Sequence, residues 1–218
     1  MVKAVLLDVD GTLIDSNDAH ARAWVEVGAE LGYDIEFGHV RRLIGMGGDR
    51  VLPQLTGLEE ESAEGSRVLD RRGEIFRERY LPRLRAFPGA RELLERLRAD
   101  GKTLVVATSA GAEDLKALLQ QAGIEDLIED STNSDEAESS KPAPDIVESA
   151  LAKSGVTAAD AVMLGDTPYD VKAARRAGVR VVALRCGGWR DADLRGAAEI
   201  HEDPAELLAH YGRSLLSG

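Results

Sequence analysis

Cysteine is almost absent from this chain. Cys186 is the single cysteine among 218 residues, so the protein has no internal disulfide framework and its composition fits a reducing compartment. The simplest role for this thiol is that of a small apolar residue at a strand end.

Long hydrophobic runs are absent as well. The apolar stretch after Met1 is cut short by Asp8, whereas a secretory signal needs roughly 7–15 apolar residues and a membrane helix about 18. We therefore expect no targeting segment, no membrane span and a cytoplasmic protein.

Positive charge is in short supply. The chain has 27 lysines and arginines against 39 aspartates and glutamates, a net charge of −12. A nucleic-acid partner held through its phosphates is therefore not expected. An acidic protein that handles anionic substrates must concentrate its positive charge locally or bind a metal ion.

The chain does have a pair of acids near its start. Residues Ala4–Leu7 form a short apolar run typical of a buried strand, and Asp8-Val-Asp-Gly-Thr12 follows at once. Two like charges at about 4 Å repel by roughly 4 kcal/mol at an effective dielectric constant of 20. A fold keeps such a pair when a cation lies between the two acids or when their protonation is used.

The remaining sequence divides into a helical part and an alternating part. Helical periodicity dominates from about residue 17 to 82, where Glu59–Tyr80 is predicted as one long helix. Apolar strand candidates then alternate with amphipathic helices closed by glycine; these candidates are Thr103–Thr108, Asp126–Asp130, Ala161–Leu164, Arg180–Leu184 and a weak one at Glu199–Ile200. The alternation predicts an α/β fold, a parallel sheet with helices on both faces. Because the first strand must join that sheet, we expect residues 1–15 and 85–218 to form the core and residues 16–84 an inserted, all-helical cap.

Polar side chains follow four of the expected strands, at the sheet edge where ligands bind in open parallel sheets. Asp8, Asp10 and Thr12 follow the first of these strands, and Thr108 and Ser109 follow the second. Lys141 follows the third, and Asp166 and Asp170 follow the fourth. Each one alone would pass as a turn residue or a helix cap. Their coincidence at four strand ends indicates a common site.

This set of side chains suits phosphoryl transfer. Two aspartates from separate strands, with a backbone carbonyl, make an oxygen site that Mg²⁺ can occupy. Hydroxyl groups, a lysine and helix N-termini supply donors for phosphate oxygens. An ionised aspartate is a nucleophile toward phosphorus. A second carboxyl group can protonate the leaving oxygen and later deprotonate water, provided that its neighbours raise its pKa.

The four segments resemble the motifs of the haloacid dehalogenase superfamily of aspartate-nucleophile phosphohydrolases. Asp8-Val-Asp-Gly-Thr-Leu is similar to the first motif, Thr108 to the second, Lys141 in Lys-Pro-Ala-Pro-Asp to the third, and Gly165-Asp-Thr-Pro-Tyr-Asp170 to the fourth. The match runs in order along nearly the whole chain. It resembles the subgroup with a helical cap inserted after the first motif, where phosphoglycolate phosphatase-like enzymes and β-phosphoglucomutases belong. The resemblance implies a three-layer, Rossmann-like core.

The resemblance also implies a role for each matching residue. Asp8 would be the nucleophile and, through its other oxygen, a magnesium ligand. Asp10 would be the general acid and base and would bind the metal through its backbone carbonyl. Asp166 would complete the protein's metal ligands.

The remaining matches concern the phosphate and the lysine. Thr108, Ser109 and Lys141 would hold the transferring phosphoryl group, and Lys141 would also steady Asp8. Asp170 would orient either the metal's waters or Lys141. The expected partner is a small phosphorylated metabolite, and the protein is expected to be a monomer or a homodimer.

Several relatives within the superfamily are open alternatives. Dehalogenases and phosphonate hydrolases generally lack the second aspartate of the first motif, so Asp10 favours phosphate ester chemistry. A phosphosugar mutase is the closer alternative, because β-phosphoglucomutases carry residues similar to His20 and Trp24. However, Gly48 stands where the mutase has a phosphate-gripping arginine, and Asp166 stands where it has glutamate. We therefore expect a phosphatase, with Arg50 as a replacement arginine if the protein is a mutase.

A non-enzymatic phosphoacceptor module is a more distant alternative, since receiver domains have no helical insertion. Substrate choice is expected to depend on the cap. The candidates for contact with the substrate are His20, Trp24, Gly47 and Tyr80. For the two aromatic residues a core role is equally well supported.

Overall fold

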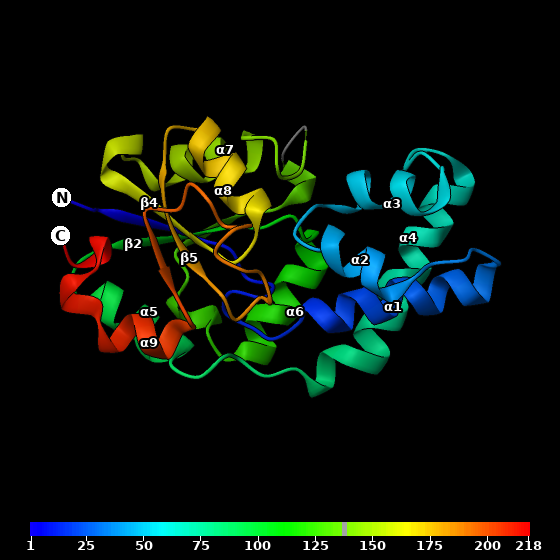
Figure 1. The fold of residues 1–218 in the computed structure, drawn as a ribbon, viewed down its shortest axis with the longest axis horizontal. Coiled ribbons are helices and arrows are strands. Elements are labelled where there is room, and N and C mark those ends of the chain that lie inside the picture. Colours follow the sequence, from blue (N-terminus) through cyan, green and yellow to red (C-terminus); the bar gives the residue numbers. More distant parts are fainter. Residues whose placement is uncertain (137–138) are drawn as a thin grey trace.

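In this computed structural model, which describes residues 1–136 and 139–218, six strands form one parallel sheet (Figure 1). In spatial order the strands are β3 (Asp130–Thr132), β2 (Thr103–Ala107), β1 (Ala4–Leu7), β4 (Ala161–Gly165), β5 (Arg180–Leu184) and β6 (Glu199–His201). All neighbouring pairs run parallel. The central strand β1 is therefore flanked by β2 and β4.

Helices cover both faces of the sheet. One layer holds α5 (Ala90–Ala99), α6 (Ala112–Ala122) and α9 (Pro204–Ala209), and the other holds α7 (Asp145–Ser154) and α8 (Pro168–Arg176). Successive side chains of β1 alternate between the layers: Val5 and Leu7 belong to one hydrophobic cluster and Leu6 to the other. This burial on both faces explains why the strand is an uninterrupted apolar run. The predicted three-layer α/β core is confirmed.

The inserted segment is helical throughout. Its helices are α1 (Asn17–Leu31), α2 (Phe37–Leu43), α3 (Gly48–Thr56) and α4 (Ala63–Ile75). They gather at the end of the molecule opposite the two termini (Figure 1), beyond the carboxyl ends of the strands. Helix α1 packs against α2 and α4 and ends at Gly32, whose φ of 85° suits glycine. None of the described helices is long and apolar enough to cross a membrane.

Two predicted elements differ from the structure. The segment Glu59–Tyr80 is not one helix: α4 starts only after Ser62, whose side chain caps it by accepting the Gly65 N–H. After Ile75 the helix widens into a π-helical turn, Phe76–Tyr80. The predicted strand Asp126–Asp130 is also wrong, because Glu125–Leu127 is a 3₁₀ turn that buries Leu127 and β3 begins at Asp130.

The fully buried central strand yields a stability prediction. Leu6 has no exposed surface, so Leu6→Ala should lower the free energy of unfolding by about 2–5 kcal/mol through lost burial and the resulting cavity. Urea unfolding followed by circular dichroism measures this change. Lys116→Ala, on the exposed face of α6, is the control and should stay within about 0.5 kcal/mol of wild type.

Candidate active site

The sheet order places the expected site residues at one edge. Strands β2 and β3 extend from one side of β1, and β4, β5 and β6 from the other, so the carboxyl ends of β1 and β4 flank the topological switch point where ligands bind. The register pairs Leu7 with both Val106 and Leu164. Asp8 therefore leaves the sheet beside the ends of β2 and β4, and Asp166 directly follows β4.

A buried lysine lies between two of the carboxylates. Lys141 Nζ is 2.6 Å from Asp8 Oδ1 and 2.7 Å from Asp170 Oδ1, and the lysine side chain has no exposed surface. Asp170 is itself fixed by a capping box at the start of α8: its Oδ2 accepts the Thr167 N–H at 2.9 Å and the Thr167 hydroxyl at 2.7 Å. Asp170 was expected to orient either the metal's waters or Lys141, and in the structure it contacts Lys141.

A third carboxylate, Asp166, joins Asp8 through a shared hydroxyl. Thr12 Oγ1 lies 2.9 Å from Asp8 Oδ2 and 3.0 Å from Asp166 Oδ1. Because a hydroxyl has one hydrogen, Thr12 donates to only one of these oxygens at a time. The other oxygen of Asp166 accepts from Asn17 Nδ2 at 3.0 Å.

The crowding shifts the pKa values of these acids. Burial raises the pKa of Asp8 to about 7, with a further rise from the charge of Asp170 and a partly offsetting attraction from Lys141. Burial and the charges of Asp8 and Asp170 raise the pKa of Asp166 well above its usual range. Burial alone would lower the pKa of Lys141, but Asp170 and Asp8 raise it, so the ammonium stays charged. One lysine therefore faces two of the three clustered acids, and the site is short of positive charge.

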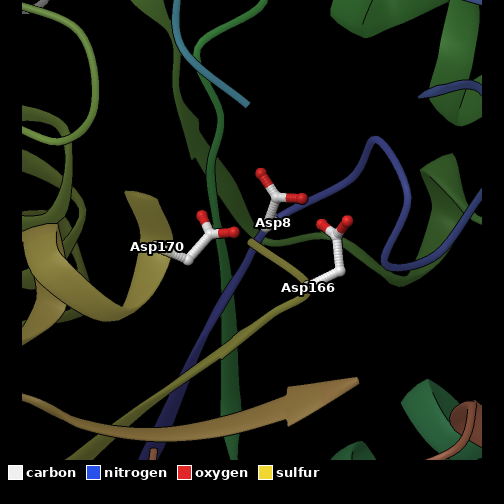
Figure 2. Close-up of side chains that lie close together, drawn as sticks. All are labelled: Asp8, Asp166 and Asp170. Carbon is white, nitrogen blue, oxygen red and sulfur yellow. The ribbon is translucent and has the colours of Figure 1, made fainter. Parts of the chain in front are cut away.

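This donor set fits a hard divalent cation. Asp8, Asp166 and Asp170 each offer one oxygen within 4.8 Å of the others, and Figure 2 shows the three side chains grouped in one place. An all-oxygen set of this kind suits Mg²⁺. Asn17 Oδ1, which is buried and has no hydrogen-bond partner among the described residues, is a further acceptor next to Asp166. Since Asp170 is engaged by Lys141 and Thr167, Asp8 and Asp166 are the carboxylates best placed to hold the ion.

Asp10 belongs to a second network, which reaches into the inserted helices. Its Oδ1 lies 2.9 Å from His20 Nε2 and accepts the Ser16 hydroxyl. The other ring nitrogen of His20 is 3.1 Å from Arg72 Nη1 on α4. A guanidinium can only donate hydrogen bonds, so His20 Nδ1 is an acceptor. His20 Nε2 therefore carries the ring hydrogen and donates a hydrogen bond to Asp10. His20 also stacks on Phe76, with ring centroids 3.9 Å apart.

The pKa of Asp10 differs from the expectation for a general acid. Burial favours the neutral carboxyl group, but the hydrogen bonds from His20 and Ser16, with the positive charge of Arg72, together lower the pKa of Asp10 below its usual value. The expected rise is therefore wrong for this state of the site. Asp10 is ionised at neutral pH, which suits a base.

The two networks meet at a cavity of about 70 Å³. The residues that line it include Asp8, Asp10, His20, Trp24, Arg72, Thr108, Ser109 and Asp114. Ile44, Gly45, Met46 and Gly48 line the cavity from the side of the inserted helices. Its size is well below the roughly 300–1,000 Å³ of a pocket for a drug-sized ligand, so it accommodates only a small group.

The residues expected to contact phosphate lie beside this cavity. Thr108 is 1% exposed at the end of β2, and its hydroxyl accepts the Ala110 N–H at 3.1 Å. Ser109 Oγ accepts the Lys141 N–H at 3.4 Å, which joins the loop after β2 to the loop that carries the lysine.

The candidates on the cap fall into two groups. His20 and Trp24 line the cavity. Gly47 is not among the residues that line the cavity, although its neighbours Met46 and Gly48 are, and it donates its N–H to Ser140 Oγ at 3.0 Å. The structure does not bring Tyr80 to the cavity: its hydroxyl donates to Glu26 on α1.

Sequence reasoning missed the polar residues that support this site from a distance. Arg72 on α4 and Arg77 in the π-helical turn both donate to Asp114 at the start of α6, and no local pattern marks any of the three. Ser16 precedes α1, but its side chain makes no capping hydrogen bond and donates to Asp10 instead. Only its proximity to the Asp-x-Asp segment could have indicated this role.

Comparison with known proteins agrees with this geometry. Residues 5–184 match the family described as haloacid dehalogenase-like hydrolase. The chain belongs to this family. It is 33% identical over 217 residues to a phosphoglycolate phosphatase of Rhodospirillum rubrum, covering 95% of this chain and 90% of that protein. It is 30% identical to the probable phosphatase IndB of Dickeya dadantii, covering 90% of this chain and 87% of that one.

A solved hydrolase structure from Pseudomonas syringae is similar across its whole length. It superposes with a TM-score of 0.89 at 30% identity, covering 97% of this chain and 98% of the other. This similarity includes the inserted helices as well as the haloacid dehalogenase-like core.

The raised pKa of Asp166 predicts a pH dependence of stability. In the metal-free protein this acid binds a proton that the unfolded chain releases near pH 4, so its contribution to the free energy of unfolding falls as pH rises above about 4. The Asp166→Asn variant has no such acid and does not lose stability in this way. Its free energy of unfolding should therefore increase relative to that of the wild type as pH rises toward neutral. Thermal unfolding in the presence of a chelator measures the difference.

A control of opposite sign is available. A hydrogen bond from Lys3 lowers the pKa of Asp160, so Asp160→Asn should lose stability relative to wild type as pH rises through about 4. A difference between Asp166→Asn and wild type that does not change with pH would contradict the proposed burial cost.

Proposed function

We propose that this protein is a Mg²⁺-dependent phosphatase that hydrolyses a small phosphate monoester through an aspartyl-phosphate intermediate. The observation that carries the proposal is Asp8, which lines the cavity together with Asp10, is paired with the buried Lys141 and lies in one group of acids with Asp166. The names of the two phosphatase relatives support the same class of reaction. The volume of the cavity favours a small ester.

The first step is attack by Asp8. Its carboxylate oxygen forms a bond to phosphorus, and the bond between phosphorus and the ester oxygen breaks. Lys141, with Thr108 and Ser109 beside the cavity, supplies positive charge and hydroxyl donors for the phosphoryl oxygens. The leaving oxygen receives a proton from Asp10. Because a bound phosphate dianion repels negative charge, substrate binding raises the pKa of Asp10 and favours the protonated form that this step needs.

The second step is hydrolysis of the aspartyl phosphate. Having lost its proton, Asp10 accepts one from water, and the water oxygen attacks phosphorus. The bond between phosphorus and Asp8 breaks, which releases inorganic phosphate and restores the carboxylate. The hydrogen bond from His20 Nε2 holds Asp10 in place and stabilises its ionised form between the two steps.

Magnesium, held by Asp8, Asp166 and the Asp10 carbonyl, would supply the missing positive charge, keep Asp8 ionised and polarise the phosphoryl group. Asp170 fixes Lys141 in the direction of Asp8.

The inserted helices, residues 16–84, act in this proposal as the cap that excludes water. Among the contacts that join them to the core, Asp49 Oδ1 accepts the Ser140 hydroxyl at 2.5 Å, Arg50 Nε donates to Ser140 O at 3.1 Å, and Tyr169 OH donates to Arg42 O at 2.5 Å. Water exclusion strengthens the electrostatic interactions inside the cavity.

A phosphosugar mutase is the alternative. His20 and Trp24 line the cavity, as this alternative requires, but Arg50 donates to a core carbonyl and is not among the residues that line the cavity. Supplying β-glucose 1-phosphate with the 1,6-bisphosphate separates the two activities. Glucose 6-phosphate is the product of a mutase, and free phosphate is the product of a phosphatase.

The nucleophile assignment predicts the outcome of one substitution. Asp8→Asn should abolish phosphate release from a panel of phosphate monoesters, because the amide cannot form the acyl phosphate, and wild-type activity should require Mg²⁺. Asp15→Asn is the matched control, since Asp15 is exposed and outside the cavity lining. Activity retained by Asp8→Asn at the wild-type level would rule out the covalent route.

The role of Asp10 predicts a dependence on the leaving group. Asp10→Asn should reduce turnover of an alkyl phosphate by about 10²–10⁴-fold but should slow the first step of p-nitrophenyl phosphate much less, because nitrophenolate leaves without a proton. A burst of one nitrophenolate per protein should precede slow turnover. Intact-protein mass spectrometry should then detect one added phosphoryl group, and equal loss for both esters without a burst would contradict this role.

A further inference from the structure

Asn17 is a buried polar residue, and the formation of helix α1 does not account for its polarity. It is the first residue of α1 and is 2% exposed, and the helix cap at Ser16 makes no use of its side chain. Its Nδ2 instead donates to Asp166 Oδ2 at 3.0 Å and to the Gly187 carbonyl at 3.3 Å. The amide orientation follows from these partners, because a rotated amide would place its oxygen against two acceptors.

Two glycines make this contact possible. A Cβ atom on Gly11, where φ is 79°, would lie 2.0 Å from Asn17 Nδ2. A Cβ atom on Gly187 would lie 1.6 Å from Asp166 Oδ2. Any larger residue at either position would displace the amide or the carboxylate. The backbone on both sides is therefore shaped around the pair formed by Asn17 and Asp166.

The two oxygens of Asp166 have different surroundings. Oδ2 is engaged by the Asn17 amide, whereas Oδ1 lies beside the Thr12 hydroxyl, on the side of Asp8. A donor fixed on Oδ2 stabilises the ionised carboxylate and restricts its rotation. Oδ1 is then held toward the place where Asp8 also presents an oxygen.

We propose that Asn17 is a positioning residue that orients Asp166 for divalent cation binding. This inference rests on the proposed function, in which Asp166 is a metal ligand. It extends the functional part of the opening segment beyond the two aspartates, to a residue on the first turn of the inserted helix.

The Gly187 carbonyl offers an internal comparison. It also accepts a hydrogen bond from Arg41 Nη2 on α2, at 2.5 Å. Arg41 therefore shares an acceptor with Asn17 but does not contact Asp166, and it pairs with Asp18 instead. An effect transmitted through the loop after β5 should appear in variants of both residues, whereas a direct effect on the carboxylate should appear only in variants of Asn17.

The test is calorimetric titration of the full-length, substrate-free protein with MgCl₂. Asn17→Ala removes the amide, and Asn17→Leu removes both hydrogen bonds while keeping the side-chain shape, in case the alanine variant fails to fold. We expect the Kd for Mg²⁺ to rise about 10–100-fold in these variants, as is usual when a partner of a metal ligand is lost. Arg41→Ala should bind Mg²⁺ like the wild type.

Thermal unfolding of the same metal-free variants separates positioning from packing. A purely structural residue would lower the melting temperature and leave the Kd for Mg²⁺ unchanged, and that result would overturn the inference. An equal loss of affinity in Arg41→Ala would also overturn it, because the effect would then belong to the loop. A wild-type protein that binds no Mg²⁺ would refute the proposed function itself, which keeps the two failures distinct.

Discussion

The buried ammonium of Lys141 is the interaction on which the rest of the site depends. It lies 2.6 Å from Asp8 and 2.7 Å from Asp170, and without it three carboxylates would be buried within a few ångströms of one another. Burying a charge is costly unless it is paired and hydrogen-bonded. Lys141 neutralises one negative charge of the cluster, and the capping box of α8 holds a second carboxylate, that of Asp170, in place. A divalent cation would neutralise the negative charge that remains.

In the proposed reaction, the inserted helices contribute to proton transfer as well as enclosing the substrate. Asp10 comes from the core, but the group that sets its pKa is His20 on α1, and the group that fixes the proton on His20 is Arg72 on α4. Arg72 in turn donates to Asp114 on the core helix α6. The protonation of Asp10, the proposed acid and base, therefore depends on the position of the cap segment relative to the core. Enclosure of the substrate and proton transfer are linked in this proposal.

Much of the fold was predictable because its signals are local. The apolar run at Ala4–Leu7, the glycines that close helices and the regular alternation after residue 87 each depend on neighbours in the chain. The errors also have physical causes. The π-helical turn after Ile75 and the late start of β3 depend on packing against residues far away in the sequence, and Tyr80 turns to Glu26 because of the position of α1. No pattern in the segment itself records these contacts.

By itself, the sequence determined which residues stand at the strand ends: two aspartates, a threonine, a lysine and two further aspartates, in the order that a parallel sheet brings to one edge. These residues share one edge because each follows the carboxyl end of its strand, and the direction of a strand is a property of the chain. Only the tertiary structure decided how they pair, that Asp170 holds Lys141, that Asn17 holds Asp166, and that Asp10 has a lowered rather than a raised pKa. Pairing and pKa depend on distances of a few ångströms and on burial, and both arise only when the chain is folded. Asp8 and Lys141, for example, stand 133 positions apart in the sequence.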